Sequence, residues 1–154
     1  MRPSYISYRL ECHAGSAEEF QKIADGETVA LRGGQEFPAP PLGVIYAKNL
    51  TPDPETGIGR YSDGQIARMM RWSVRPDGRA SVRPLMPFHN MSQQDLDAII
   101  SFLRTQSPVR NVVPGNKFTL IGKIVKSLAP TFKPRDAINP PQVSPAEAMN
   151  QGTR

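Results

Sequence analysis

The chain has 154 residues, a mass of 17.0 kDa and a net charge of +5, which is enough for one domain with a hydrophobic core. Its only cysteine, Cys12, excludes an intramolecular disulfide and any zinc site with several cysteines, and two histidines leave little material for a multi-histidine metal cage. No uncharged run reaches the length of a membrane-spanning helix, and the first residues lack the apolar stretch of a secretory signal. Sixteen prolines predict that much of the chain is extended or looped.

The positive charge is concentrated in the last third of the chain. Residues 1–107 carry twelve basic and twelve acidic side chains, whereas residues 108–154 carry seven basic and two acidic ones. A nucleic-acid-binding domain usually spreads its positive charge over one face, so we expect no nucleic-acid partner. The basic tail is either a solvated linker or a docking segment for an acidic partner or an anionic membrane surface.

In chain order, the first expected element is a weak helix over residues 17–23. Residues 24–61 are dominated by glycine and proline turn patterns and show little periodicity. Their one β-like run, residues 44–46, is too isolated to predict a sheet.

Two later helices have both a cap and an apolar face. The first covers residues 62–74, where Ser62 and Gln65 form a capping-box pattern. The second covers residues 92–104, with Ser92 as the cap and the Asp95 side chain placed to hydrogen-bond back to Ser92. Apolar residues recur at helical spacing in each (Ile66, Met69, Met70 and Val74; Leu96, Ile99, Ile100 and Leu103).

After Pro108 the pattern predicts a weaker amphipathic helix over residues 116–128, followed by an extended, proline-rich linker over 129–154. Few helices and long loops provide a small hydrophobic core for a chain of this length, and such loops need a surface to pack against. A large bound apolar group would provide that surface.

The dipeptide Cys12-His13 is half of a motif with known chemistry. In the C-x-x-C-H motif of c-type haem attachment, two thiols bind the haem and the histidine ligates iron. Arg9 occupies the position of the first cysteine, so the motif is incomplete. The alternative interpretation is a buried thiol beside a surface histidine.

A methionine in a later loop offers a second iron ligand. Met86 stands just before the capped helix at Ser92, where its thioether is suited to the open face of a haem iron. The alternative is a methionine of the hydrophobic core.

Several loop and helix segments together resemble one haem domain of the class I-type multihaem cytochromes c that accompany membrane-bound alcohol and aldehyde dehydrogenases. The resemblance spans residues 10–110 and is carried by four segments: 46–59, 74–79, 86–92 and 99–103. It implies an all-α, cytochrome c-like fold, with a few helices and long Pro/Gly loops wrapped around a haem. We therefore expect a haem domain over residues 1–107 and a basic tail over 108–154, similar to the family's connector to a following haem domain.

The resemblance implies a role for three residues at the iron. Cys12 would form the thioether to haem c, His13 would be the proximal ligand and Met86 the distal ligand. Met91 is a competing candidate, but it precedes the Ser92 cap and is expected to pack in the core. His89 would instead give two histidine ligands, but it does not match the family's position and Met86 does.

Other residues are implied to surround the haem. Pro41 resembles the proximal-side proline whose backbone carbonyl accepts the histidine N–H, which would orient the ring. Asn49 is expected to line the haem edge through turn hydrogen bonds. Tyr46 and Trp72 match no ligand, and we interpret both as packing residues or as contacts of the haem propionates.

The sequence also departs from the family. Arg9 leaves only one thioether, through Cys12. The N-terminal helix is expected to be shortened or missing, with Tyr5 or Tyr8 replacing its aromatic residue. Because haem c is attached outside the cytoplasm, the absence of a signal suggests a fragment or an altered product of a longer cytochrome. By resemblance the location is the periplasm or the periplasmic face of the membrane.

The expected function is electron transfer and not catalysis. A haem with His13 and Met86 as ligands has no open iron position for a substrate, and the sequence offers no nucleophile–base pair. We expect single electrons to be relayed between a dehydrogenase subunit and a redox acceptor. The alternative is a haem-free fragment or relic that acts as an interaction module, through Met69, Met70 and the lysine-rich helix over 116–128.

Overall fold

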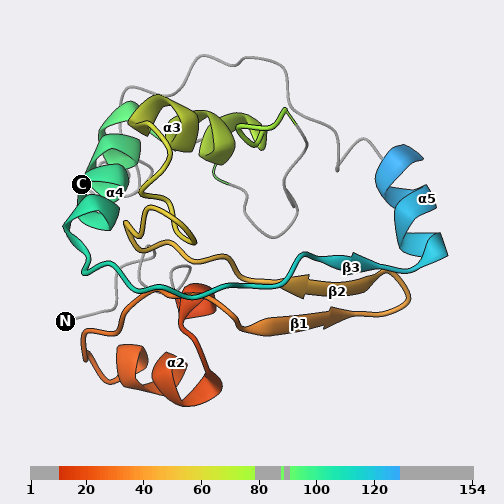
Figure 1. Ribbon diagram of the computed structural model, residues 1–154, viewed down its shortest axis with the longest axis horizontal. Helices are drawn as coiled ribbons and strands as arrows, with labels where there is room; N and C mark the ends of the chain where they lie inside the picture. Colours follow the sequence, from red (N-terminus) through yellow and green to blue (C-terminus); the bar gives the residue numbers. More distant parts are fainter. Residues whose placement is uncertain (1–10, 79–87, 89–90, 129–154) are drawn as a thin grey trace, which may run out of the picture. The chain divides into compact units, whose positions relative to one another are not determined.

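A computed structural model describes residues 11–78, 88 and 91–128. Its contacts divide the chain into two compact units, residues 1–60 with 103–125 and residues 61–102 with 126–154. The elements, in chain order (Figure 1), are η1 (Glu11–His13), α2 (Ala17–Ala24), β1 (Glu36–Ala39), β2 (Gly43–Tyr46), α3 (Asp63–Trp72), α4 (Gln93–Thr105), β3 (Lys117–Phe118) and α5 (Leu120–Leu128).

The all-α prediction is wrong, because the first unit contains a three-stranded antiparallel sheet in the order β1-β2-β3. Strands β1 and β2 form a hairpin in which Glu36 lies opposite Tyr46. Strand β3 pairs with the other edge of β2, with Lys117 opposite Val44. Residues 44–46 are therefore not isolated: they form the central strand.

The sheet was missed because its strands are short and weakly marked. Strand β1 contains Pro38, a residue typical of turns, but a proline is tolerated on an edge strand. Strand β3 has two residues, and they lie near the start of the helix predicted over 116–128. That helix, α5, begins only at Leu120, so the predicted start of the helix is wrong.

The predicted start of the weak helix and of the first capped helix is confirmed. At α2, the Ser16 hydroxyl accepts a hydrogen bond from the Glu19 N–H at 3.2 Å. At α3, the Ser62 hydroxyl accepts from the Gln65 N–H at 3.3 Å, and Gln65 Oε1 accepts from the Ser62 N–H at 3.0 Å. Helix α3 ends before Ser73, which is left-handed with φ of 56°.

In the second unit, the start of α4 is held to the end of α3. The Ser92 hydroxyl accepts from the Asp95 N–H at 3.0 Å and donates to Asp95 Oδ2 at 2.8 Å. The Arg71 guanidinium donates to the Met91 carbonyl at 2.9 Å and to Gln93 Oε1 at 3.1 Å. The predicted apolar faces supply buried apolar residues of this unit: Ile66 and Met70 on α3, and Leu96, Ile99 and Ile100 on α4. Val74 is also buried but lies beyond the end of α3, so the predicted end of that helix at residue 74 is wrong.

The segment before β3 lies along the first unit. Asn111 Nδ2 donates to the carbonyl oxygens of Arg32 and Gly33, at 2.9 and 3.2 Å. Asn116 Oδ1 accepts from the Tyr46 N–H at 3.0 Å. Part of the expected tail is thus built into this unit, whose buried apolar residues are Ala14, Leu31, Ala47, Ile58 and Leu103. The tail over 129–154 lies outside the described residues.

Among the described residues, no helix is long and apolar enough to cross a membrane.

The two serine caps predict different losses of stability. Ser92→Ala removes a fully buried hydroxyl with two hydrogen bonds, so we expect a loss of about 2 kcal/mol in the free energy of unfolding. Ser62→Ala removes an exposed cap, with an expected loss of about 1 kcal/mol. Urea denaturation followed by circular dichroism measures both. Ser101→Ala, at an exposed position within α4, is the control and should leave stability nearly unchanged; a larger loss for Ser62→Ala than for Ser92→Ala would contradict this account.

Candidate functional site

The imidazole of His13 is buried and held in one orientation. It ends η1 and is 8% exposed, and its Nδ1 lies 2.7 Å from the Lys48 carbonyl oxygen. Because a carbonyl only accepts, Nδ1 must carry the proton and donate. Among the described residues Nε2 has no hydrogen-bond partner, so its lone pair is available for a bond to a metal or to a donor.

Burial also keeps this ring neutral. Desolvation lowers the pKa of His13, and the hydrogen bond to the Lys48 carbonyl offsets part of that effect. A neutral imidazole with a fixed Nδ1–H is the form that binds metal ions through Nε2.

Gly33 lets the main chain pass directly against the Lys48 carbonyl. Its N–H donates to the His13 carbonyl at 2.8 Å, and its φ of 67° lies in the left-handed region. A Cβ atom here would collide with the Lys48 carbonyl group, the acceptor of the His13 ring. The backbone and the ring of His13 are therefore both fixed by the same crossing of two segments, at Gly33 and Lys48.

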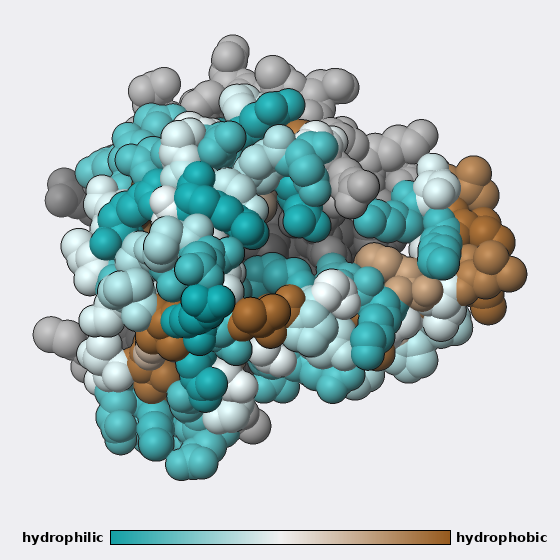
Figure 2. All heavy atoms as spheres, in the orientation of Figure 1, coloured by the Kyte–Doolittle hydropathy of each residue, from teal (hydrophilic) through white to brown (hydrophobic). Residues whose placement is uncertain are grey.

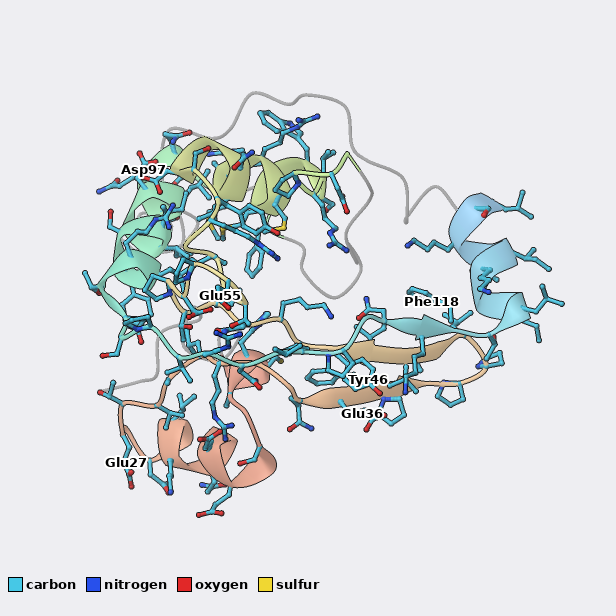
Figure 3. All side chains as sticks on the ribbon, in the orientation of Figure 1. Glu27, Glu36, Tyr46, Glu55, Asp97 and Phe118 are labelled. Atoms are coloured by element: carbon cyan, nitrogen blue, oxygen red, sulfur yellow. The ribbon has the colours of Figure 1, made fainter. Side chains whose placement is uncertain are left out.

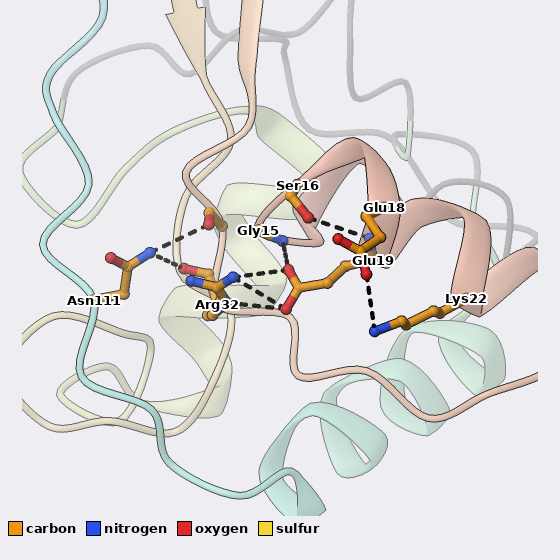
Figure 4. Close-up of polar contacts among 8 residues, drawn as sticks. Gly15, Ser16, Glu18, Glu19, Lys22, Arg32 and Asn111 are labelled. Atoms are coloured by element: carbon orange, nitrogen blue, oxygen red, sulfur yellow. Dashed lines mark hydrogen bonds and ion pairs between the residues drawn. The ribbon is translucent and has the colours of Figure 1, made fainter.

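A carboxylate ties η1 and α2 to the segment that contains Gly33 (Figure 4). Glu19 accepts from the Gly15 N–H at 2.8 Å, and Arg32 Nη2 lies 3.0 Å from both of its carboxylate oxygens. Both side chains are partly exposed, so the pair adds little to stability. Its fork-like geometry instead defines how the turn after His13 meets residue 32.

Cys12 is exposed, next to the buried His13. The short η1 helix thus places a thiol at the surface and an imidazole in the interior, from neighbouring positions. Among the described residues there is no cluster of three or more metal-binding side chains. The chemistry available here is one thiol that can be modified and one nitrogen ligand.

The expected role of the Pro41 carbonyl is not observed. Pro41 lies in the turn between β1 and β2, and its carbonyl accepts from the Thr119 hydroxyl at 2.7 Å. The His13 ring donates to Lys48 instead. The sequence did not indicate Lys48, because the acceptor is a backbone carbonyl, which every residue has whatever its side chain. Any contact of Pro41 with a cofactor stays a prediction.

Tyr46 makes contacts within the sheet (Figure 3). Its hydroxyl donates to Glu36 Oε1 at 3.2 Å across the hairpin, and the Lys117 ammonium lies 5.9 Å from the centre of its ring. These contacts favour the packing interpretation. A cofactor contact of Tyr46 also stays a prediction.

Asn49 fixes the loop that follows the sheet. It is buried, and its Nδ2 donates to Thr56 Oγ1 at 3.1 Å and to the Val109 carbonyl at 2.8 Å. Its Oδ1 accepts from the N–H and the hydroxyl of Thr51, at 3.0 and 2.7 Å. The turn hydrogen bonds expected at Asn49 are thus present, while the expected contact with the haem edge is untested. Val109, from the predicted tail, is a partner that the sequence did not indicate.

The same loop contains a buried carboxylate. Asp53 Oδ1 accepts from the hydroxyl and the N–H of Thr56, at 2.7 and 2.6 Å, and from the Glu55 N–H at 3.2 Å. These hydrogen bonds lower the pKa of Asp53, and the one from the Thr56 hydroxyl has the largest effect. Asp53 therefore holds the turn as a charged carboxylate.

The remaining predicted residues belong to the second unit or precede η1. Met86, His89 and Arg9 lie outside the described residues. Met91 is half-buried at the start of α4. The Trp72 indole N–H is buried and has no hydrogen-bond partner among the described residues, so it is a donor that still needs an acceptor.

Comparisons with known proteins confirm the resemblance to cytochrome c subunits of dehydrogenases. No family model matches the chain. The cytochrome c subunit of a quinone alcohol dehydrogenase from Gluconobacter oxydans is 42% identical over 73 residues, 46% of this chain and 15% of the relative. The fructose dehydrogenase cytochrome subunit of Gluconobacter japonicus is 32% identical over 108 residues, 68% of this chain and 21% of the relative.

A nicotinate dehydrogenase subunit from Pseudomonas putida is 42% identical over 80 residues, 50% of this chain. The chain spans only 7% of that relative. It is therefore similar to one part of much longer dehydrogenase subunits.

Substitution of Gly33 tests how the His13 ring is positioned. Gly33→Ala should displace the Lys48 carbonyl and lower stability by clearly more than the about 1–2 kcal/mol cost of a left-handed alanine. Nitrogen NMR of the His13 ring should also show loss of the fixed Nδ1–H. Gly26→Ala is the matched control, since Gly26 has φ of 88° but open space around it. Equal effects of both substitutions on stability and on the ring would contradict the proposed packing.

The hydrogen bonds of Asp53 predict a dependence of stability on pH. Its folded pKa lies below that of an unfolded aspartate, about 3.9, so the unfolded state binds the proton more readily. The stability that Asp53 contributes is complete well above that value and is lost as the pH falls through the folded pKa.

Thermal unfolding between acidic and neutral pH should show this for the native chain and not for Asp53→Asn. Glu27→Gln, at an exposed site, should follow the native profile. Parallel profiles of the native chain and Asp53→Asn across this range would refute the assignment.

Proposed function

We propose that this chain provides a haem c domain that transfers single electrons within a dehydrogenase complex. The observation that supports this most directly is the His13 ring, buried and donating from Nδ1 to the Lys48 carbonyl at 2.7 Å. The relatives include cytochrome c subunits of dehydrogenases, which favours the same role.

The residues of η1 fit a covalently attached haem. Cys12 is exposed and would form the thioether bond, and it would do so alone because Arg9 replaces the first cysteine of the motif. His13 would bind iron through Nε2, because its Nδ1 is engaged and its lowered pKa keeps the ring neutral at pH 7. When bound, haem supplies reversible one-electron chemistry.

The Lys48 carbonyl sets the properties of this ligand. A hydrogen bond to the far nitrogen of a metal-bound histidine fixes the plane of the ring and increases its basicity. The carbonyl lies directly against the Gly33 backbone, so a side chain at position 33 would displace it. A ring that this hydrogen bond keeps in one orientation would lower the reorganisation needed for electron transfer.

On the basis of the sequence pattern, Met86, in preference to Met91 or His89, would be the second residue that holds the iron. With His13 and Met86 both bound to it, the iron would have no place for a substrate, so the domain would carry electrons and not catalyse a reaction.

The partners follow from this role. Electrons would pass from a dehydrogenase subunit to a redox acceptor on the periplasmic side of the membrane, where haem c is attached. Pro41, Tyr46 and Asn49 would contact the haem from its surroundings and would not bind the iron.

The proposal is tested by producing the chain in exported form with haem c maturation proteins. We expect covalent haem on a denaturing gel and a haemochrome band shifted as for one remaining vinyl group. Cys12→Ala should abolish the covalent bond, and His13→Ala should abolish low-spin iron. A colourless but folded native chain would refute the proposal and favour the haem-free interaction module.

The second ligand is tested in the same preparations. Met86→Ala should remove the iron–sulfur charge-transfer absorption, whereas the matched control Met91→Ala should retain it. If His89→Ala removes low-spin character and Met86→Ala does not, the second ligand is His89.

A further inference from the structure

Helix α5 exposes its apolar side chains. Four large aliphatic residues on it are at least half exposed: Leu120 at 75%, Ile121 at 54%, Ile124 at 51% and Leu128 at 72%. Figure 2 shows hydrophobic residues gathered over this helix. Residues 120, 124 and 128 follow each other at four-residue spacing, with Ile121 beside them, so they form one stripe.

The opposite side of α5 is attached to the sheet. Gly122 is buried, and a Cβ atom there would collide with the Leu42 carbonyl. Thr119 donates from its N–H to that same carbonyl at 3.0 Å, and its hydroxyl accepts from the Gly122 N–H at 3.0 Å. The hydrogen bonds of Thr119 therefore attach the start of the helix to the β1–β2 turn, and Gly122 allows the close approach.

This arrangement reverses the usual amphipathic surface helix. Such a helix normally buries its apolar stripe and exposes its polar residues. Here the glycine side meets the protein and the apolar stripe faces outward, so the stripe is available to a partner. Exposed apolar surface of this kind marks sites of interaction with proteins or membranes.

The stretch of sequence that contains α5 carries only positive charge. Residues 98–135 contain seven basic side chains and no acidic one, and three of the lysines lie on or next to the helix: Lys117, Lys123 and Lys126. An anionic partner is therefore complementary to this stretch.

The composition of the helix favours lipid over an acidic protein. Protein interfaces depend on tryptophan, tyrosine and arginine anchors, and α5 contains none of these. Aliphatic residues flanked by lysines are instead typical of helices that lie in a bilayer interface, where lysine stems extend toward the headgroups.

We propose that α5 docks onto an anionic lipid bilayer. Leu120, Ile121, Ile124 and Leu128 enter the headgroup boundary, while Lys123, the exposed lysine beside this stripe, contacts lipid phosphates. We name these five residues the α5 surface. The contact is peripheral and reversible, because a single short helix buries little area. It does not depend on bound haem.

The test is co-sedimentation of the full chain with vesicles at low and high salt. We expect binding to vesicles of equal parts phosphatidylcholine and phosphatidylglycerol, and binding at least about tenfold weaker to phosphatidylcholine alone. High salt should weaken the anionic binding several-fold, because it screens the lysines.

Two matched pairs of variants locate the contact. Ile124→Asp should reduce partitioning about tenfold or more, whereas Val112→Asp, at an apolar site 76% exposed outside α5, should not. Lys123→Glu should reduce anionic binding and its salt dependence more than Arg68→Glu, an exposed charge reversal on α3. Circular dichroism should show that all four variants are folded.

Three outcomes would overturn the proposal. The first is equal binding to both kinds of vesicle, or none to either. The second is self-association in the absence of lipid that Ile124→Asp abolishes, which would assign the α5 surface to a second copy of the chain. The third is binding to polyglutamate without binding to vesicles, which would assign it to an acidic protein.

Discussion

The hydrogen bond from the His13 ring to the Lys48 carbonyl is the constraint on which the candidate site depends. It defines the tautomer, leaves Nε2 without a hydrogen-bond partner among the described residues, and connects η1 to the chain that leaves β2. The bond exists because Gly33 allows two backbone segments to cross without a side chain between them. A buried histidine whose Nδ1 donates to a carbonyl leaves Nε2 for another bond, which is why we propose His13 as the iron ligand.

The sequence predicted the helices well where a local interaction sets their limits. The predicted serine caps, Ser62 and Ser92, accept from backbone N–H groups three residues later, so the pattern and the structure report the same contact. The apolar faces of α3 and α4 could also be predicted from local sequence, because helical spacing alone determines which residues share a side.

The sheet and the ring acceptor could not be predicted in the same way, because both depend on contacts between distant residues. Strand β3 pairs with β2 across more than seventy positions, and a two-residue strand carries no periodicity. The acceptor at Lys48 is a main-chain atom, so the identity of residue 48 carries no information about it. Pro41 was a reasonable choice from resemblance, but its carbonyl is already bonded to Thr119.

The hairpin connects the two regions of the first unit on which the proposals depend. After β2 the chain reaches Lys48, which orients His13, and before β2 the turn contains Leu42, whose carbonyl accepts from the Thr119 N–H just before α5. One short element therefore positions the proposed iron ligand at one end and the start of an outward-facing apolar helix at the other. If α5 rests on a bilayer, the sheet fixes the height and tilt of η1 above it. Such a geometry would restrict the directions from which an electron donor or acceptor approaches His13.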